Sequence, residues 1–278
     1  MVQSDLKVYG MINMKKFISL LIFCAAATTA SSVCSLNAYA ENLDIRYRLS
    51  LAGLSLGTAH MSGAVSASNY QLSIGAKLQG LVGLVLSGSG AAQGSGAISN
   101  GKPSSSGYSL SANNSTMTRT IQMAIANMSV GKVAVDPPFE EHPDRIPLDA
   151  TTKKGIVDPV GALVMPASGN PLDPSECNRT LPVFDSFQRF NVTLSYTATR
   201  NVSIRGYQGP VLVCAARYTP IAGHRPTRKQ TVFMENNKDM SAWLMPVGET
   251  GVLLPFRISV KTQVGTSVIE ADAVNVVK

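Results

Sequence analysis

The stretch Cys177-Asn178-Arg179-Thr180-Leu181-Pro182-Val183-Phe184-Asp185 opens the part of the chain that decides its fold. It leads into a segment in which apolar and polar residues alternate, with one face made by Phe190, Val192, Leu194, Tyr196 and Ala198. A period of two residues is the pattern of a half-buried β-strand. The stretch ends with Cys214 and the run Tyr218-Thr219-Pro220-Ile221-Ala222-Gly223-His224-Arg225-Pro226. We therefore expect a sheet protein organised around residues 177–226.

The N-terminal residues have the pattern of a secretory signal peptide. Lys15 and Lys16 precede an apolar run over residues 17–27, and Ala38-Tyr39-Ala40 fits an A-x-A cleavage site. The run is shorter than the roughly 20 residues that span a bilayer, so a membrane anchor is the weaker alternative. We expect residues 1–40 to be removed after export, with the true start at Met1 or at Met14. No other segment predicts a transmembrane helix.

Removal of residues 1–40 leaves Cys177 and Cys214 as the only cysteines. An exported chain folds in an oxidising compartment, so the simplest inference is that these two are bonded to each other. Such a bond stabilises the fold by on the order of 4 kcal/mol in the chain-entropy model. Taking three lysines and one aspartate from the 24 basic and 17 acidic residues leaves a net charge of +5. This mild surplus fits an anionic envelope surface and a generic solvated surface equally well.

Alternation of apolar and polar residues predicts further short strands separated by Gly, Ser and Asn. We expect them near residues 44–51, 58–65, 70–78, 108–112, 119–126, 131–135, 231–234, 242–245, 256–262 and 267–277. Residues 136–176 are rich in proline, which removes donors from a sheet. Within them, residues 158–164 predict one short helix, with Asp158 as N-cap and Pro159 at its first position.

These elements predict an all-β fold. We expect a single strongly curved antiparallel sheet, an open barrel or a spiral, with one short helix, forming one periplasmic domain over residues 41–278. An outer-membrane barrel is the competing interpretation, but the chain has one Trp and no pair of aromatic girdles.

Residues 80–101 are rich in glycine and begin with the apolar run Leu81-Val82-Gly83-Leu84-Val85-Leu86. We favour a buried strand in which glycines permit close backbone approach. The alternative is a mobile apolar flap that touches lipid or a ligand.

Few residues predict chemistry. Gly53-Leu54-Ser55-Leu56-Gly57 matches the nucleophile-elbow pattern, and Ser55 with His224 would make a hydrolase, but the flanking segments alternate like strands and no helix follows. The spacing of the histidines predicts no metal site. A cluster of His224, Arg225, Arg228 and Lys229 is a candidate for binding an anion or a lipid headgroup, against the alternative of a solvated loop. Candidate cavity-lining residues are Phe190, Leu194, Tyr196 and Trp243.

Three motifs together carry a resemblance: Y-x-L-x-x-A-G-L-x-L-G over residues 47–57, C-x-R-T-x-P-V-F-D-x-x-x-R-F over residues 177–190, and C-x-x-x-Y-x-P-I-A-G-H-x-P over residues 214–226. With them the chain resembles an uncharacterised proteobacterial periplasmic family, the domain-of-unknown-function family of the DUF 3108 type. The resemblance implies an exported, β-rich protein with a bridge between Cys177 and Cys214. It brings no catalytic residue. Family members often carry glycine after Phe-Asp, where this chain has Ser186.

These observations favour recognition over catalysis. We expect a periplasmic protein that maintains the envelope, or binds an apolar ligand or an envelope protein or lipid, and that is not an enzyme. The alternatives are an envelope-directed hydrolase using Ser55 and His224, and a structural scaffold with no pocket. We expect no cofactor and no nucleic-acid partner, and the sequence does not predict an oligomeric state.

Overall fold

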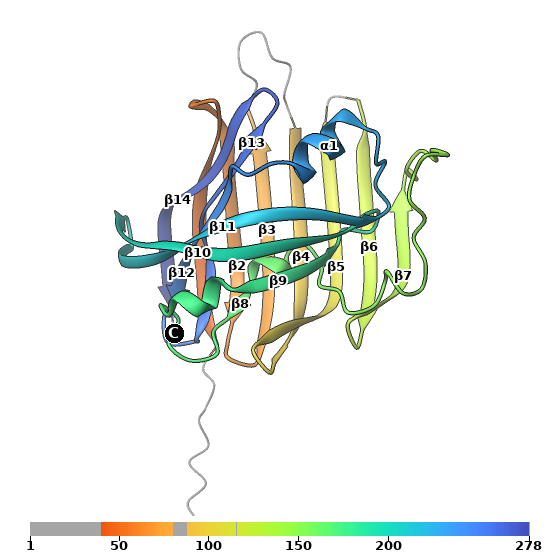
Figure 1. The fold of residues 1–278 in the computed structure, drawn as a ribbon. Coiled ribbons are helices and arrows are strands. Elements are labelled where there is room, and N and C mark those ends of the chain that lie inside the picture. The colour runs from red at the N-terminus through yellow and green to blue at the C-terminus, as the bar shows by residue number, and fades with distance from the viewer. Residues whose placement is uncertain (1–39, 80–87, 115, 278) are drawn as a thin grey trace, which may run out of the picture. The chain divides into compact units, whose positions relative to one another are not determined.

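Alternating burial organises most of the chain into one antiparallel sheet (Figure 1). The structure is a computed structural model that describes residues 40–79, 88–114 and 116–277. In β1, every second side chain from Glu41 to Leu49 is buried, as a half-buried strand requires. The strands are β1 Glu41–Leu51, β2 Leu54–Val65, β3 Asn69–Leu78, β4 Gly88–Ser99, β5 Lys102–Asn114, β6 Thr118–Ala126, β7 Ser129–Asp136, β8 Met165–Pro166, β9 Arg179–Phe184, β10 Arg189–Ile204, β11 Tyr207–Ala222, β12 Met240–Val247, β13 Val252–Thr262 and β14 Gly265–Val277.

The sheet consists of two antiparallel meanders, β1–β7 and β9–β14, and the pairing of β1 with β14 joins them. Its order is β7-β6-β5-β4-β3-β2-β1-β14-β13-β12-β11-β10-β9, and β8 pairs with β13. β1 and β14 are antiparallel neighbours, with Ile45 opposite Val274. β7 and β9 are the two end strands, so the sheet does not close. The predicted open, curved antiparallel sheet is therefore confirmed.

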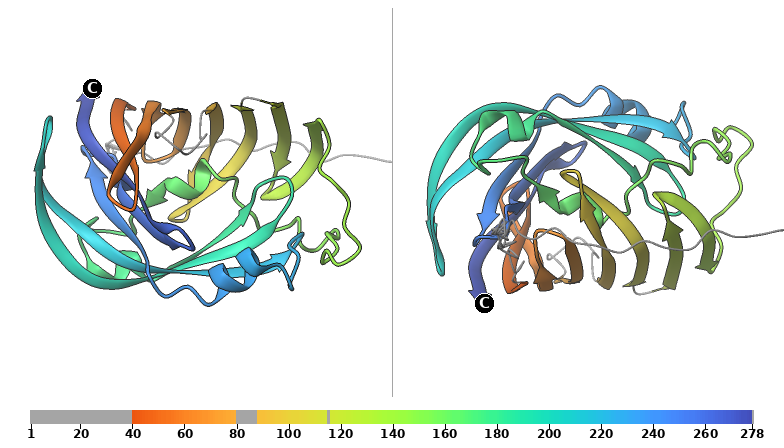
Figure 2. Two further views of the ribbon diagram at one scale, coloured as in Figure 1. Left: turned by 90° about the horizontal axis from the view of Figure 1, so that it is seen from above. Right: turned by 90° about the horizontal axis from the view of Figure 1, so that it is seen from below.

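The sheet folds over on itself and encloses a segment of its own chain. In both views of Figure 2, β9–β11 lie across from β1–β7, and the segment that carries the 3-10 helix η1 (Gly161–Leu163) runs between them. We call residues 155–166 the plug segment. Its Ile156, Val160 and Val164 belong to the main hydrophobic core, together with side chains of β1–β3, β5 and β6. The inner face of β1–β7 is thus covered by the chain itself.

A disulfide joins the loop before β9 to β11. Cys177, at the end of the 3-10 helix η2 (Pro174–Cys177), is bonded to Cys214, with 5.6 Å between their Cα atoms. Both cysteines are buried in a second hydrophobic cluster with Leu194, Leu212 and Leu244. The predicted disulfide is confirmed.

Two local predictions need correction or sharpening. Residues 231–234 were expected as a strand, but they lie in the α-helix α1 (Lys229–Glu235), where the Val232 N–H donates to the Arg228 carbonyl at 3.1 Å. Four residues of mixed apolar character do not distinguish the two periods, so that prediction was wrong. The helix expected over residues 158–164 is present as the shorter η1, and the Asp158 carboxylate accepts from the Val160 and Gly161 N–H groups at 2.8 and 3.0 Å. None of the described helices is long and apolar enough to cross a membrane.

The glycine-rich stretch becomes β4 from Gly88 onward. A Cβ atom at Gly94 would lie 2.6 Å from the Val160 Cβ, and one at Gly96 would lie 2.8 Å from the Tyr70 hydroxyl. Glycine therefore allows the plug segment to approach the sheet backbone. The apolar run over residues 81–86, on which the flap alternative depends, lies outside the described residues, as does the predicted signal peptide up to residue 39.

Candidate binding sites

A buried carboxylate fastens the plug segment to the sheet. Asp158 is fully buried. The Ser105 hydroxyl donates to its Oδ2 at 2.5 Å and accepts from the Asp158 N–H at 3.0 Å. The Tyr70 hydroxyl also donates to Oδ2, at 3.4 Å. With the two N–H donors of η1, this closed network satisfies the carboxylate and fixes where the plug segment enters the core.

Burial raises the pKa of Asp158 above its ordinary value of 3.8, and the hydrogen bonds from Ser105, Gly161, Val160 and Tyr70 oppose that shift. Burial also raises the pKa of Tyr70, and the negative charge of Asp158 adds to the effect. The side chains of Tyr70, Ser105 and Asp158 form hydrogen bonds with one another. We therefore assign the network to structure.

A cleft of about 800 Å³ lies beside the plug segment, a volume within the range of ligand sites in proteins. We call it the motif cleft, because residues 178–182 of the second family-like motif form one wall. The turn between β4 and β5 and the plug segment form the others. Its lining is Asn100, Gly101, Lys102, Pro103, Met128, Gly155, Val157, Val164, Ser168, Ser175, Glu176, Asn178, Arg179, Thr180, Leu181 and Pro182.

An ion pair stiffens the wall of the motif cleft. Glu176 is buried, and the Arg179 guanidinium pairs with its carboxylate. Arg179 Nε donates to the Glu176 carbonyl at 2.6 Å, and Nη1 donates to the Pro166 carbonyl at 3.0 Å. The other carboxylate oxygen of Glu176 accepts from the Ser168 N–H at 2.7 Å. Burial lowers the pKa of Arg179 while Glu176 raises it. Because both partners are occupied, they hold the wall and leave little to offer a ligand.

The remaining lining of the motif cleft is amphipathic. Val157 and Val164 are buried at its base, and Leu181 and Pro182 are half-buried. Lys102 is exposed and makes no ion pair with any residue in the described ranges. Exposed amides come from Asn100 and Asn178. This arrangement offers an apolar base, hydrogen-bonding groups at the rim and one cation.

The predicted basic cluster around His224 is largely engaged elsewhere. Arg225 Nε is 2.9 Å from an oxygen of Asp144, and Arg228 donates to the Gln230 side chain at 3.2 Å. The backbone carbonyl of His224 accepts from the Ile146 N–H at 2.9 Å. The Nδ1 atom of the His224 ring is buried and has no hydrogen-bond partner in the described chain. Lys229 is exposed at the start of α1. Anion binding by this cluster stays a prediction, with the Arg225 charge already paired.

The four residues predicted to line a cavity, Phe190, Leu194, Tyr196 and Trp243, lie in different surroundings in the structure. Leu194 is buried in the disulfide cluster, whereas Trp243 packs on the main core and stacks with Phe256 at a ring distance of 6.4 Å. Phe190 contacts the Tyr218 ring at 5.3 Å. Tyr196 is 38% exposed.

Ser55 lies in β2, just after the turn at Ala52 and Gly53 that joins it to β1, and it is exposed. Both sides of the Gly-x-Ser-x-Gly match are therefore strand, where a nucleophile elbow needs a strand followed by a helix. Within the described ranges, no group of three or more His, Cys, Asp or Glu residues is placed to hold a metal ion.

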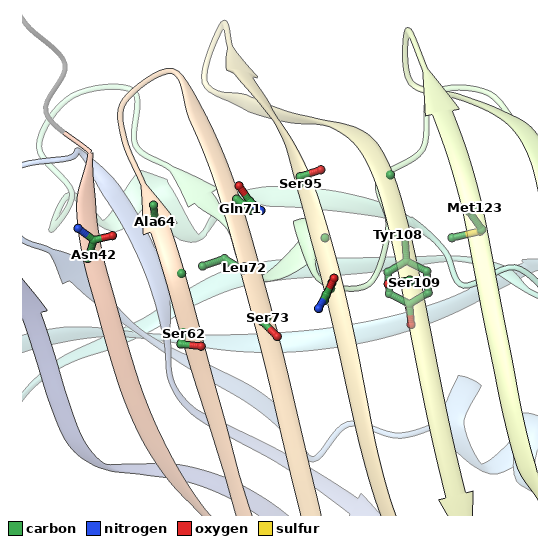
Figure 3. Close-up of a pocket in the computed structure, with 14 residues that line it drawn as sticks. Asn42, Ser62, Ala64, Gln71, Leu72, Ser73, Ser95, Tyr108, Ser109 and Met123 are labelled. Carbon is green, nitrogen blue, oxygen red and sulfur yellow. The ribbon is translucent and has the colours of Figure 1, made fainter.

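A second depression, the face groove, lies on the opposite surface of the sheet. It has a volume of about 590 Å³ and crosses β1 to β6 (Figure 3). Its lining is Asn42, Ser62, Gly63, Ala64, Gln71, Leu72, Ser73, Gln93, Gly94, Ser95, Gly107, Tyr108, Ser109 and Met123. The alternation of each strand turns Gln71, Ser73 and Gln93 away from the core that holds Leu72.

The sequence patterns did not single out Lys102, Asn100 or the residues of the face groove as a site. The second motif marks residues 178–182, but only the folded sheet brings the β4–β5 turn and the plug segment next to it. The alternation of β3 and β4 was the available signal for the face groove, because it predicts which side chains point outward.

Comparison with known proteins agrees with the motifs. The model of a family described as "Protein of unknown function (DUF3108)" matches residues 46–272. Among solved structures, the chain is similar to a beta-barrel-like protein of domain of unknown function DUF1849 from Brucella abortus, with a TM-score of 0.49 and 11% sequence identity. That likeness covers 85% of this chain and 98% of the other. The comparison with curated proteins finds no significant match.

Proposed function

This chain belongs to the DUF3108 family of proteins of unknown function, and we propose that it is an exported binding protein of the cell envelope that holds a small amphipathic ligand in the motif cleft. The ligand has an apolar part that rests on Val157 and Val164. Its polar or anionic end faces Lys102 and the rim amides. The protein recognises this molecule and does not transform it.

The observation that carries the proposal is the construction of the motif cleft. The disulfide at Cys177 and the paired Glu176 and Arg179 hold the wall in place before any ligand arrives. A preformed site binds more tightly because less conformational freedom is lost on binding. A stiffened wall around an open volume, with a lysine at the rim that pairs with no acidic residue of the described ranges, is suited to binding a ligand.

Two features of the chain support the inference that it is exported. The signal-like residues 1–40 end where β1 begins, at Glu41. A disulfide is also typical of proteins that fold outside the reducing cytosol. Both support a location in the periplasm, where an envelope lipid or one of its fragments is available as an amphipathic ligand.

The proposal is tested by native mass spectrometry of the protein purified from its own periplasm. We expect an additional mass on the wild-type protein that organic solvent removes. The Ser168→Trp variant should lose this additional mass. The Ser168 hydroxyl lies close to Gly101, 3.7 Å from the position that a Cβ atom on this glycine would take. A large ring at residue 168 should therefore obstruct the mouth of the cleft. Lys102→Glu should reduce the occupied fraction at least threefold if the ligand is anionic.

Ser195→Trp is the matched control, since Ser195 is exposed on β10 and does not line the cleft. It should retain the additional mass. Wild-type protein that carries nothing, or equal occupancy in the Ser168→Trp and Ser195→Trp variants, would exclude the motif cleft as the ligand site.

A further inference from the structure

The outer face of β3 to β6 is almost without charge. In register across the four strands lie Ser73, Gln93, Ser109 and Gln122. The rows on either side are made of serine, threonine, asparagine, glutamine, alanine and glycine. Within the described ranges, the exposed charged residues of these strands are Lys77 in β3 and Lys102 at the very start of β5. No described element covers this face (Figure 2).

Such a surface departs from the rest of the chain and from ordinary solvated sheets. The sequence carries 24 basic and 17 acidic residues, and solvent-facing surfaces are commonly about a quarter to a third charged. Charged side chains lie next to this uncharged surface, on β1, β2 and β14. The His60 Nε2 lies 2.8 Å from Asp44, and Arg46 lies 3.8 Å from Asp272. Solvation alone does not require so few charged residues on the outward side of four neighbouring strands.

The face groove is the hollow part of this uncharged surface. Hydroxyl groups of Ser62, Ser73 and Ser95 line it, together with the amides of Asn42, Gln71 and Gln93 (Figure 3). The amide side chains of Gln71 and Gln93 make no hydrogen bond to any described residue. Short side chains between them keep the surface low, so a ligand can reach both the amides and the strands.

We propose that the face groove binds a neutral glycan chain. Sugar hydroxyls both donate and accept hydrogen bonds, and amide and hydroxyl side chains do the same, so each can satisfy the other. An ionic ligand would lose its hydration without finding an opposite charge, and a hydrocarbon would cover the amides without pairing them. A groove that crosses six strands suits an extended polymer. This site is separate from the motif cleft and does not depend on it.

The test uses isothermal titration calorimetry to measure the dissociation constants of three hexasaccharides for the purified protein. Two are neutral, the hexamers of N-acetylglucosamine and of α-1,4-linked glucose, and one is an anionic hexamer of uronic acid. We expect at least one neutral hexamer to bind and the anionic one to bind at least tenfold more weakly. The double variant Gln71→Ala/Gln93→Ala should weaken neutral binding about tenfold, because it removes two amides that can pair with hydroxyls.

Gln208→Ala serves as the matched control, since Gln208 is an exposed glutamine on β11, outside the face groove. It should bind the neutral hexamer like the wild type. The Ser168→Trp variant should also bind it unchanged, which separates this proposal from the one for the motif cleft. Failure of both neutral hexamers to bind, stronger binding of the anionic one, or equal loss in Gln208→Ala would overturn the inference.

Discussion

Ser186 occupies a backbone conformation that suits glycine. Its φ is +87°, in the left-handed region, and its buried hydroxyl has no hydrogen-bond partner in the described chain. The turn itself is well made, since the Asp185 carboxylate accepts from the Phe187 and Gln188 N–H groups at 2.9 and 2.7 Å. We expect Ser186→Gly to raise the free energy of unfolding by about 1 kcal/mol, because it relieves the strain. Urea denaturation measures this. Ser195→Gly, in mid-strand, should instead lower it, and the same sign for both would contradict the assignment.

Asp158 is predicted to make stability depend on pH. Its pKa is raised in the folded state above the ordinary 3.8, so the folded protein binds more protons than the unfolded chain in the pH range between 3.8 and the folded-state pKa. The stability that it contributes is therefore complete below pH 3.8 and falls as the pH rises through the folded-state pKa. Asparagine does not titrate. The wild type should thus lose stability relative to Asp158→Asn between pH 3.5 and pH 7, as followed by denaturant midpoints. A difference that stays constant, or that grows in favour of the wild type, would show that the buried carboxylate is not destabilised.

At the scale of elements, the plug segment depends on glycine in β4. A Cβ at Gly94 would lie 2.6 Å from Val160 and 2.9 Å from the Asp158 carboxylate, whereas one at Gly90 would meet its nearest atom at 3.4 Å. We expect Gly94→Ala to lower the free energy of unfolding by about 2 kcal/mol through overpacking. Gly90→Ala should change it by less than about 1 kcal/mol. Thermal unfolding of the two variants compares them directly, and equal effects would argue against close packing of the plug segment.

β1 begins where the signal peptide is predicted to end. Glu41 is buried, and its carboxylate accepts from the Glu249 N–H at 2.9 Å, in the turn between β12 and β13. Cleavage after Ala40 would leave this residue at the mature N-terminus, already fixed to the sheet. Intact-mass measurement of protein from the periplasm should give a chain that starts at Glu41. A mature chain that starts downstream of Glu41 would lack this contact and would contradict the prediction.

At the scale of the whole molecule, the disulfide joins the loop that carries the second motif to the long hairpin of β10 and β11. Cys177 and Cys214 are separated by 37 residues, so the bond should contribute on the order of 4 kcal/mol. The double variant Cys177→Ser/Cys214→Ser should show a correspondingly lower denaturant midpoint than the wild type. Reductant should shift the wild type toward the variant and leave the variant unchanged. Equal midpoints for the two proteins would mean that the bond does not constrain the unfolded chain.

The fold could largely be predicted from the sequence because each half-buried strand repeats every two residues, as in β1 and β6. Strands with a weaker pattern were predicted less fully. For β4, glycine on its inner side leaves little apolar signal, so the sequence predicts a strand within residues 80–101 without its bounds. β9, which is six residues long and contains Pro182, was not predicted. The helix α1 was missed because none of its residues is buried and it has no apolar stripe.

The motif cleft could be predicted only in part. Arg179 and Thr180 belong to a recognisable motif, but Lys102 and Val164 reach the same cleft from the β4–β5 turn and from the plug segment. Their proximity follows from the folding of the sheet over its own chain, which no local pattern encodes. The pairing of Arg179 with Glu176 likewise depends on a loop whose course is set by the disulfide.

The most direct test of ligand binding in the motif cleft is the crystal structure of the protein purified from its own periplasm without extraction. We predict electron density for a bound molecule between Gly101 and Ser168, with its polar end near Lys102. An empty cleft in crystals of protein that mass spectrometry shows to carry a ligand would contradict it.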